Sequence, residues 1–208
     1  NKTVSIGTLA LADGSNGGLA ANYTLTGGTH QLTVNQRPLN ATLARQYDAT
    51  KNAAGSDLSS FNSLQGGETL TLSGSGTVND DNVASGQAIT LGSLALVDGT
   101  GLASNYTLNA ANLNITKRVL NSSGSKIYDA NTNAVSSNIT LSNLIGTQTV
   151  NHSGTASTSS ANAGSYTISN LTGVSIADGS NGGLALNYTL TGGTHNFTVN
   201  QAPISFTG

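Results

Sequence analysis

Along this chain, apolar side chains recur at every second position in short runs separated by Gly, Asn and Asp. Alternation of this kind, in stretches rich in Thr, Val, Ile and Tyr, is typical of a strand with one buried face. In residues 37–117 the runs are Leu39-Ala41-Leu43-Tyr47, Leu70-Leu72, Ile89-Leu91, Leu94-Leu96, Tyr106-Leu108 and Leu113-Ile115. No stretch gives three turns of helical period, and the best helix candidate is Ser56 to Ser63, with Ser56 or Asp57 as its cap.

The same pattern returns along the chain as an internal repeat. Residues 12–36 (ADGSNGGLAANYTLTGGTHQLTVNQ) reappear almost letter for letter at 177–201, and a looser copy occupies 97–117. The shared Asn-Tyr-Thr-Leu places tyrosines at positions 23, 106 and 188, which are steps of 83 and 82 residues. A second motif, Arg45-Gln-Tyr-Asp-Ala49, returns 81 residues later as Lys126-Ile-Tyr-Asp-Ala130. The chain is therefore a tandem array.

A repeat of about 80 residues is long enough to bury its own small core, unlike the shorter units of a solenoid. We expect an all-β fold of tandem small β-domains, sandwich-like or alternatively β-grasp-like, arranged as a semi-rigid rod. Pro38 and Pro203 mark equivalent junctions without a flexible linker. The expected divisions are 1–36 (the C-terminal half of a repeat), 37–117 and 118–201 (complete repeats) and 202–208 (the start of the next).

Composition narrows the function classes. Charged residues make up 8% of the chain and the net charge is −2, without runs of like charge, so we expect no nucleic-acid partner. No apolar run is long enough to suggest membrane insertion. The absence of Cys excludes disulfides and thiolate chemistry. With no Met either, the sequence is expected to be a piece of something longer.

The motif set resembles the YDG-type repeats of filamentous-haemagglutinin-like bacterial adhesins, which leave the cell by two-partner secretion. The resemblance is carried by the two basic-X-Tyr-Asp-Ala motifs, by Ala161-Asn-Ala-Gly164 and by the closing Asn-Tyr-Thr-Leu. It implies a secreted protein of the bacterial surface whose repeats form a stalk or binding shaft. The departure is Ala49 and Ala130, where the family name implies Gly. If that Gly has a positive φ, Ala there is strained or the turn differs in type.

The repeat motifs supply the candidate site residues, and we interpret them as structural. Tyr47-Asp48 and Tyr128-Asp129 either display a polar handle to a ligand or place a Tyr in the core while Asp caps the turn, and the second interpretation is favoured. The pairs Asn22-Tyr23, Asn105-Tyr106 and Asn187-Tyr188 recur as glycosylation sequons, and we attribute this recurrence to a turn-and-strand requirement.

No catalytic, metal or cofactor site is predicted. His30 and His195 share a repeat position that Leu113 fills in the middle copy, which indicates packing rather than chemistry. The loops with Asp80, Asp81 and Asn82, and with Asp178, Ser180 and Asn181, offer too few carboxylates for a tight calcium site. A Lys–Asn cross-link at Lys117 or Lys126 is a further hypothesis that intact mass decides.

The leading functional prediction is a non-enzymatic stalk or passenger segment of a surface adhesin, supporting attachment, aggregation or biofilm formation. Its expected partner is a glycan or protein receptor on a host or bacterial surface. The alternative is a carbohydrate-binding module that contacts polysaccharide directly, although Trp is absent. Self-association through an open sheet edge in residues 1–36 is a third possibility.

Overall fold

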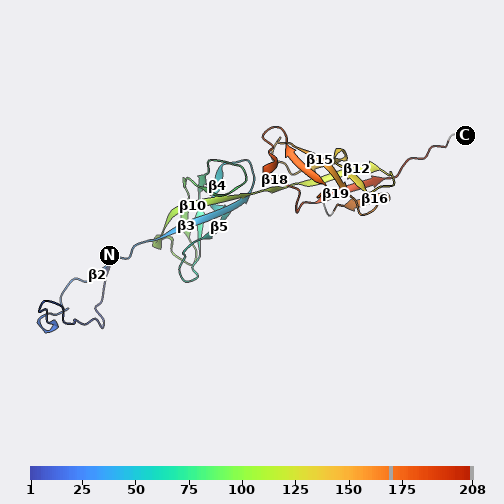
Figure 1. The fold of residues 1–208 in the computed structure, drawn as a ribbon. Helices are drawn as coiled ribbons and strands as arrows, with labels where there is room; N and C mark the ends of the chain where they lie inside the picture. The colour runs from blue at the N-terminus through green and yellow to red at the C-terminus, as the bar shows by residue number, and fades with distance from the viewer. Residues whose placement is uncertain (169–170, 207–208) are drawn as a thin grey trace.

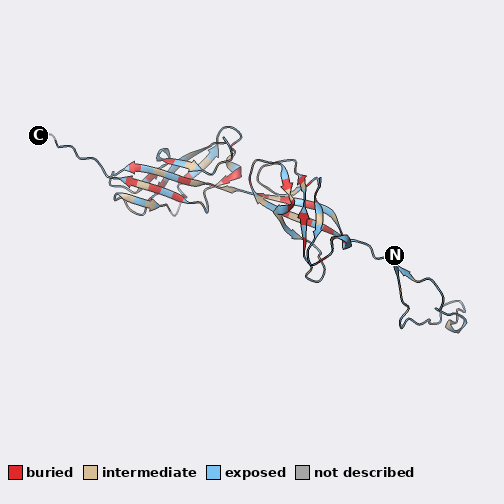
Figure 2. Ribbon diagram, turned by 180° about the vertical axis from the view of Figure 1, so that it is seen from behind, coloured by how far each residue is buried: buried red, intermediate tan, exposed pale blue. Residues whose placement is uncertain are grey.

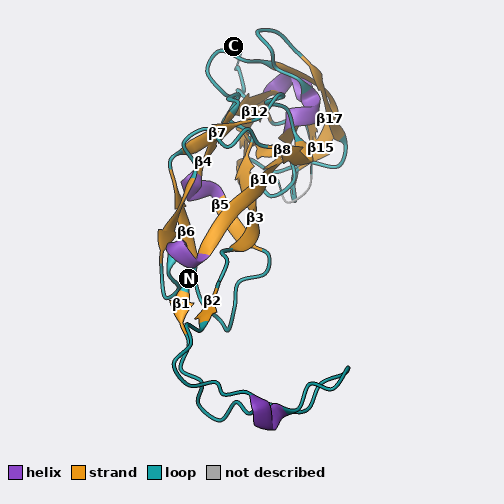
Figure 3. Cartoon of the chain, turned by 90° about the vertical axis from the view of Figure 1, so that its left-hand side faces the viewer, coloured by secondary structure: helices purple, strands orange, loops and turns teal. Residues whose placement is uncertain are grey.

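The computed structural model describes residues 1–168 and 171–206, which form two β-sandwich bodies in a row between an open N-terminal segment and an extended C-terminal tail (Figure 1). We call residues 37–117 the first unit and residues 118–201 the second. The prediction of an all-β chain of small β-domains is confirmed, since the helical segments of the described residues are all short 3₁₀ turns (Figure 3).

The first unit has a four-stranded sheet and a second layer that is made of two-stranded pairs. The sheet order is β5 (Leu58–Phe61), β3 (Arg37–Gln46), β10 (Tyr106–Thr116) and β8 (Ala84–Ala88). The second layer contains the pairs β4 (Asn52–Ala54) with β7 (Ser75–Thr77) and β6 (Leu70–Ser73) with β9 (Ala95–Asp98). Two 3₁₀ turns, η2 (Gly55–Asp57) and η3 (Ala103–Asn105), connect strands.

The second unit repeats this arrangement. Its sheet order is β14 (Ile139–Ser142), β12 (Asn121–Ile127), β19 (His195–Asn200) and β16 (Gly164–Thr167). Other pairings join β13 (Asn133–Val135), β15 (Val150–Ser157) and β17 (Val174–Asp178), and, separately, β11 (Arg118–Val119) and β18 (Tyr188–Thr189). Its 3₁₀ turns are η4 (Ser136–Asn138) and η5 (Ala185–Asn187).

The first and last strands of each unit lie side by side and run parallel. β3 pairs with β10 from Arg37↔Tyr106 to Gln46↔Thr116. In the second unit the equivalent first strand is interrupted only at Leu120, so that β11 pairs with β18 at Arg118↔Tyr188, and β12 pairs with β19 from Ser122↔His195 to Ile127↔Asn200. A unit is therefore entered at one end and left at the opposite end. β10 ends at Thr116 and β11 begins at Arg118, so a single residue passes the chain from one unit to the next.

Alternating side chains of the paired strands make the core. Leu39, Leu43 and Leu113 are fully buried on one face, while the polar neighbours Asn40 and Asn112 are exposed (Figure 2). The largest apolar cluster does not stop at the end of the first unit, because it also includes Leu120, Val150 and Tyr188 of the second. The two units consequently share part of their core, whereas the sequence suggested a separate core in each.

The helix proposed for Ser56 to Ser63 is wrong. Residues 55–57 form the 3₁₀ turn η2, and Leu58 to Phe61 form strand β5, antiparallel to β3 with Leu43 opposite Leu58. The edge of β3 offers a ladder of backbone partners. A seven-to-eight-residue helix without tertiary support is unstable by comparison.

Residues 1–36 do not form a sandwich. They contain only β1 (Lys2–Thr3), antiparallel to β2 (Gln31–Leu32), and the turn η1 (Ala20–Asn22). Leu32 and Val34 are exposed, while their repeat equivalents Phe197 and Val199 are buried. The difference follows from the parallel partner strand that the second unit has at β12 and this segment lacks.

Candidate functional site at the joint between the units

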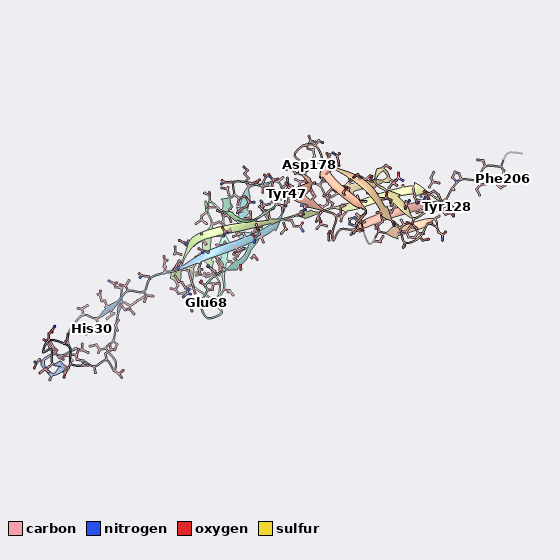
Figure 4. The ribbon with its side chains drawn as sticks, in the orientation of Figure 1. His30, Tyr47, Glu68, Tyr128, Asp178 and Phe206 are labelled. Atoms are coloured by element: carbon pink, nitrogen blue, oxygen red, sulfur yellow. The ribbon has the colours of Figure 1, made fainter. Side chains whose placement is uncertain are left out.

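Tyr47 is the residue on which the joint is centred. It follows β3 directly, is 2% exposed, and its N–H donates to the carbonyl of Thr116 at the end of β10. This places the ring at the end of the first unit, where it meets Tyr188 of the second in an edge-on arrangement with 5.5 Å between ring centroids (Figure 4). An edge-to-face aromatic pair contributes about 0.5–1.5 kcal/mol beyond its buried area.

Gln148 joins the two tyrosines through one side-chain amide. Its Nε2 donates to the Tyr47 hydroxyl at 2.9 Å, and its Oε1 accepts from the Tyr188 hydroxyl. The Tyr188 hydroxyl also accepts from the backbone N–H of Ile145 at 3.2 Å. Burial raises the pKa of Tyr188, so its hydroxyl stays a proton donor at neutral pH.

Asn187 makes the second polar contact across the joint. Its side chain is fully buried, its Oδ1 accepts from the backbone N–H of Val83 at 2.9 Å, and its Nδ2 donates to Asn82 Oδ1 at 2.8 Å. Asp80 holds that loop in shape by accepting from both the N–H and the Nδ2 of Asn82. Tyr47, Asn82 and Val83, which we call the first docking surface, thus receive the N-terminal end of the second unit.

The Tyr-Asp-Ala turn is fixed by its own side chains. Asp48 accepts from the N–H and hydroxyl of Thr50 and pairs with Arg45, whose Nη2 also donates to the Thr50 carbonyl. Ala49 and Ala130 have φ of 58° and 62°. The turn therefore keeps the left-handed conformation that favours Gly, and both alanines carry the strain that the sequence raised as one alternative.

Lys126 occupies the place of Arg45 in the second unit. Its Nζ lies 2.9 Å from Asp129 Oδ1 and donates to the backbone carbonyl and Oδ1 of Asn131 at 2.7 and 2.9 Å. The hydrogen bond from Lys126 lowers the pKa of Asp129. The matching contact of Arg45 with the Thr50 carbonyl in the first unit indicates that Lys126 holds the turn in place.

The other recurring Asn-Tyr pairs lie at the N-terminal end of the first unit and in the open N-terminal segment, and in the described part of the chain neither is docked on a neighbouring unit. Tyr106 is buried, and its hydroxyl donates to Glu68 and accepts from the N–H of Gln65, as Tyr188 does with Gln148 and Ile145. The Glu68 bond raises the pKa of Tyr106. Asn105 is exposed where Asn187 is buried, and Asn22 and Tyr23 are exposed in the open N-terminal segment.

The remaining polar candidates have local partners. His195 contacts Ser122 Oγ at 3.1 Å and the Leu190 carbonyl at 2.8 Å, and His30 contacts the Leu25 carbonyl at 3.1 Å. Asp13, Asp98 and Asp178 each accept from the first N–H of a following 3₁₀ turn. Ser180 and Asn181 bond to Thr149 and Thr147. Among the described residues, no three His, Asp or Glu side chains cluster as metal ligands.

A cavity of about 860 Å³ lies beside the joint, against the second unit. Its walls include Lys117, Leu171, Leu186, Leu190 and His195. Tyr188 also lines it, but this side chain is 0% exposed and so does not offer a free flat face for a sugar. In the part of the chain that is described, no helix is long and apolar enough to cross a membrane.

Sequence reasoning missed Gln148, Asn82 and Val83 as joint residues. A signal existed, because aligning 63–70 with 143–150 puts Glu68 opposite Gln148, each able to accept from the tyrosine of its own unit. Asn82 was considered only as part of an acidic cluster.

These features define a repeating β-sandwich unit that joins its neighbour through tyrosine and amide contacts. Residues 29–115 match the family model of the YDG domain, so this span of the chain is a YDG domain. Comparison with curated proteins and with solved structures gives no match. The matched span begins two residues before β2 and ends within β10.

Proposed function

We infer that the chain is a non-enzymatic, load-bearing stalk segment of a large secreted bacterial surface adhesin. Its role is to hold a binding region away from the cell during attachment, aggregation or biofilm formation. The observation that carries this proposal is the parallel pairing of the first and last strands in each unit, with one residue between units.

This geometry suits tension applied along the rod. Force enters the first unit at Arg37 and leaves it at Thr116, so β3 and β10 are pulled in opposite directions along their shared ladder. Their register pairs ten positions, and the hydrogen bonds between them share the load. A ladder loaded in this way yields only when many bonds break together, which slows forced unfolding.

Single-molecule pulling tests the mechanical part. The chain has no Cys, so introduced thiols provide unique handles. Handles beyond both ends of the first unit load the β3–β10 ladder in shear. Handles at Gln46→Cys and Thr116→Cys, kept reduced, load one rung of the same ladder. We expect a clearly higher unfolding force in the first geometry, and equal forces would contradict a load-bearing role.

A display experiment tests the biological part. The chain is placed between a cell-surface anchor and a tip of known ligand, and a Gly/Ser linker of equal length replaces it in the control. We expect the chain to support more attachment under flow, with binding specificity set by the tip. Reproducible binding of a defined glycan by the chain alone would favour a carbohydrate-binding module instead.

A further inference from the structure

The two units end in equivalent surfaces, and only one of them is covered. In the first unit, Tyr47, Asn82 and Val83 receive the second unit. The repeat places Tyr128, Asn162 and Ala163 at the same positions of the second unit, and all three are exposed there. Figure 4 shows Tyr47 between the two bodies and Tyr128 at the far end of the second.

The turn beneath this second surface is already formed. Lys126 and Asp129 hold the Tyr-Asp-Ala turn as Arg45 and Asp48 do. Ser160 Oγ accepts from the N–H of Asn162, in the way that Asp80 accepts from Asn82. Tyr128 is 43% exposed, against 2% for Tyr47. The two tyrosines therefore differ in exposure because Tyr47 has a neighbouring unit packed on it, and not because the local backbone differs.

The opposite end of a unit carries the complementary groups. In the second unit these are Asn187, Tyr188 and Gln148, which are engaged with the first unit. In the first unit they are Asn105, Tyr106 and Glu68, and the Tyr106–Glu68 bond is made while Asn105 is exposed. An acceptor of the same kind, an amide or carboxylate oxygen, is thus repeated at each N-terminal end.

We propose that Tyr128, Asn162 and Ala163 form a second docking surface, which binds the N-terminal end of a further unit of this repeat joined in the same chain. The occupant presents an Asn-Tyr pair after a 3₁₀ turn and a Gln or Glu that bonds both tyrosines. Ala163 can replace Val83 in the hydrogen bond to Asn187, because Val83 contributes its backbone N–H; the apolar contact of the Val83 side chain becomes smaller with Ala163.

The contact favours a unit in the same chain over a second copy. It consists of one aromatic pair, a few hydrogen bonds and a small apolar contact that includes Leu120 and Val150. A stable interface between separate proteins buries roughly 1,200–2,000 Å². A one-residue connection raises the effective concentration enough for such a contact to persist. The proposal concerns assembly alone and stands or falls independently of the stalk function.

The test adds a third unit to the chain. A copy of residues 118–201 is fused directly after Gln201 in place of 202–208, which reproduces the one-step passage at Lys117–Arg118. Backbone ¹⁵N relaxation and residual dipolar couplings then report whether the second and third units tumble as one body. We expect them to do so, with the relative orientation that the first and second units have.

Variants separate docking from simple linkage. Tyr128→Ala should uncouple the third unit and lower the thermal midpoint of the second by at least about 10 °C in the three-unit chain, as Tyr47→Ala should for the first unit in the natural chain. In the natural chain the same change should shift it little, because Tyr128 is exposed there. Tyr128→Phe should lower the thermal midpoint of the three-unit chain less than Tyr128→Ala, since the ring contact remains. Tyr47→Ala in the natural chain is the positive control.

Three results would overturn the proposal. One is a third unit that tumbles independently of the second. Another is an equal effect of Tyr128→Ala in the natural and three-unit chains. The last is a dimer of the natural chain that Tyr128→Ala abolishes, since this would assign the surface to a second copy.

Discussion

Replacing Ala130 by Gly should stabilise the second unit. Ala130 has a φ of 62° and is exposed, so its methyl group contributes backbone strain without buried contact. A left-handed conformation costs a non-glycine residue roughly 1–2 kcal/mol. Gly loses about 0.5–1 kcal/mol through the greater freedom of the unfolded chain. The difference between the two is a gain of up to about 1.5 kcal/mol, centred on about 0.75 kcal/mol.

Ala49→Gly provides the internal comparison. Its φ of 58° carries the same strain, but Ala49 is half-buried and packs against the apolar cluster at the joint. Losing half of a buried methyl group, at about 0.8 kcal/mol for full burial, removes about 0.4 kcal/mol of the gain. Ala49→Gly should therefore stabilise less than Ala130→Gly, by a few tenths of a kcal/mol.

The assay is equilibrium unfolding in guanidinium chloride followed by far-ultraviolet circular dichroism, with calorimetry to separate the two units. Ala95→Gly is the matched control, because Ala95 is an exposed residue of β9 without a positive φ. It should destabilise by about 0.5–1 kcal/mol. If Ala130→Gly destabilises as much as Ala95→Gly, the turn is not strained in solution and the reasoning fails.

Three further predictions concern the joint, the core and pH. Tyr47→Ala should destabilise the chain by about 3–5 kcal/mol and Tyr47→Phe by about 0.5–1.5 kcal/mol, while Tyr128→Ala in the natural chain should cost less than about 1 kcal/mol. Denaturant unfolding midpoints measure the three effects. Equal effects of Tyr47→Ala and Tyr128→Ala would contradict the joint. Gly124→Ala should destabilise the second unit by about 1–3 kcal/mol, because the new methyl carbon would lie 2.2 Å from the Asn138 carbonyl oxygen and 2.9 Å from the Phe197 ring. Ser123 is exposed in the same strand, so Ser123→Ala should change the free energy of unfolding by no more than about 0.5 kcal/mol in the same measurement. In Asp129→Asn the free energy of unfolding should fall less steeply as the pH is lowered. Lys126 lowers the pKa of the Asp129 carboxyl in the folded state. The stabilisation from this carboxylate is therefore fully present above its unfolded pKa of about 3.9 and is lost as the pH falls through the lowered folded pKa. Unfolding curves from about pH 2 to pH 5 measure this, and an unchanged slope in the variant refutes it.

The all-β fold class could be predicted from the sequence because the alternation of apolar and polar residues is a local signal, and the repeat recurs at a nearly fixed spacing. The limits are visible in residues 12–36 and 177–201. These stretches are nearly identical in sequence, yet the second forms the six-residue strand β19 and the first contributes only two residues to β2. The deciding factor is β12, a strand about 70 residues distant from β19, and no local pattern contains it.

The joint was harder to predict than the fold. Tyr47 is buried and Asp48 bonds within its own turn, but the residues that cover Tyr47 lie about 100 and 140 positions away in the sequence. Tyr128 has the same local sequence and is exposed. The role of such a residue depends on which unit stands next to it, and one sequence motif cannot encode that. The expectation of a separate core in each unit was wrong for the same reason, because the apolar side chains at the joint pack against those of the neighbouring unit.

The parallel placement of the first and last strands also sets how far the molecule reaches. Each unit of about 80 residues advances the axis by little more than its eleven-residue strand β10, or about 36 Å at 3.3 Å per residue. Fully drawn out, the same residues span about 280 Å. Each sandwich therefore stores roughly seven to eight times its folded length. A tether assembled from such bodies can lengthen by successive rupture of single units and so limit the peak tension at its attachment point.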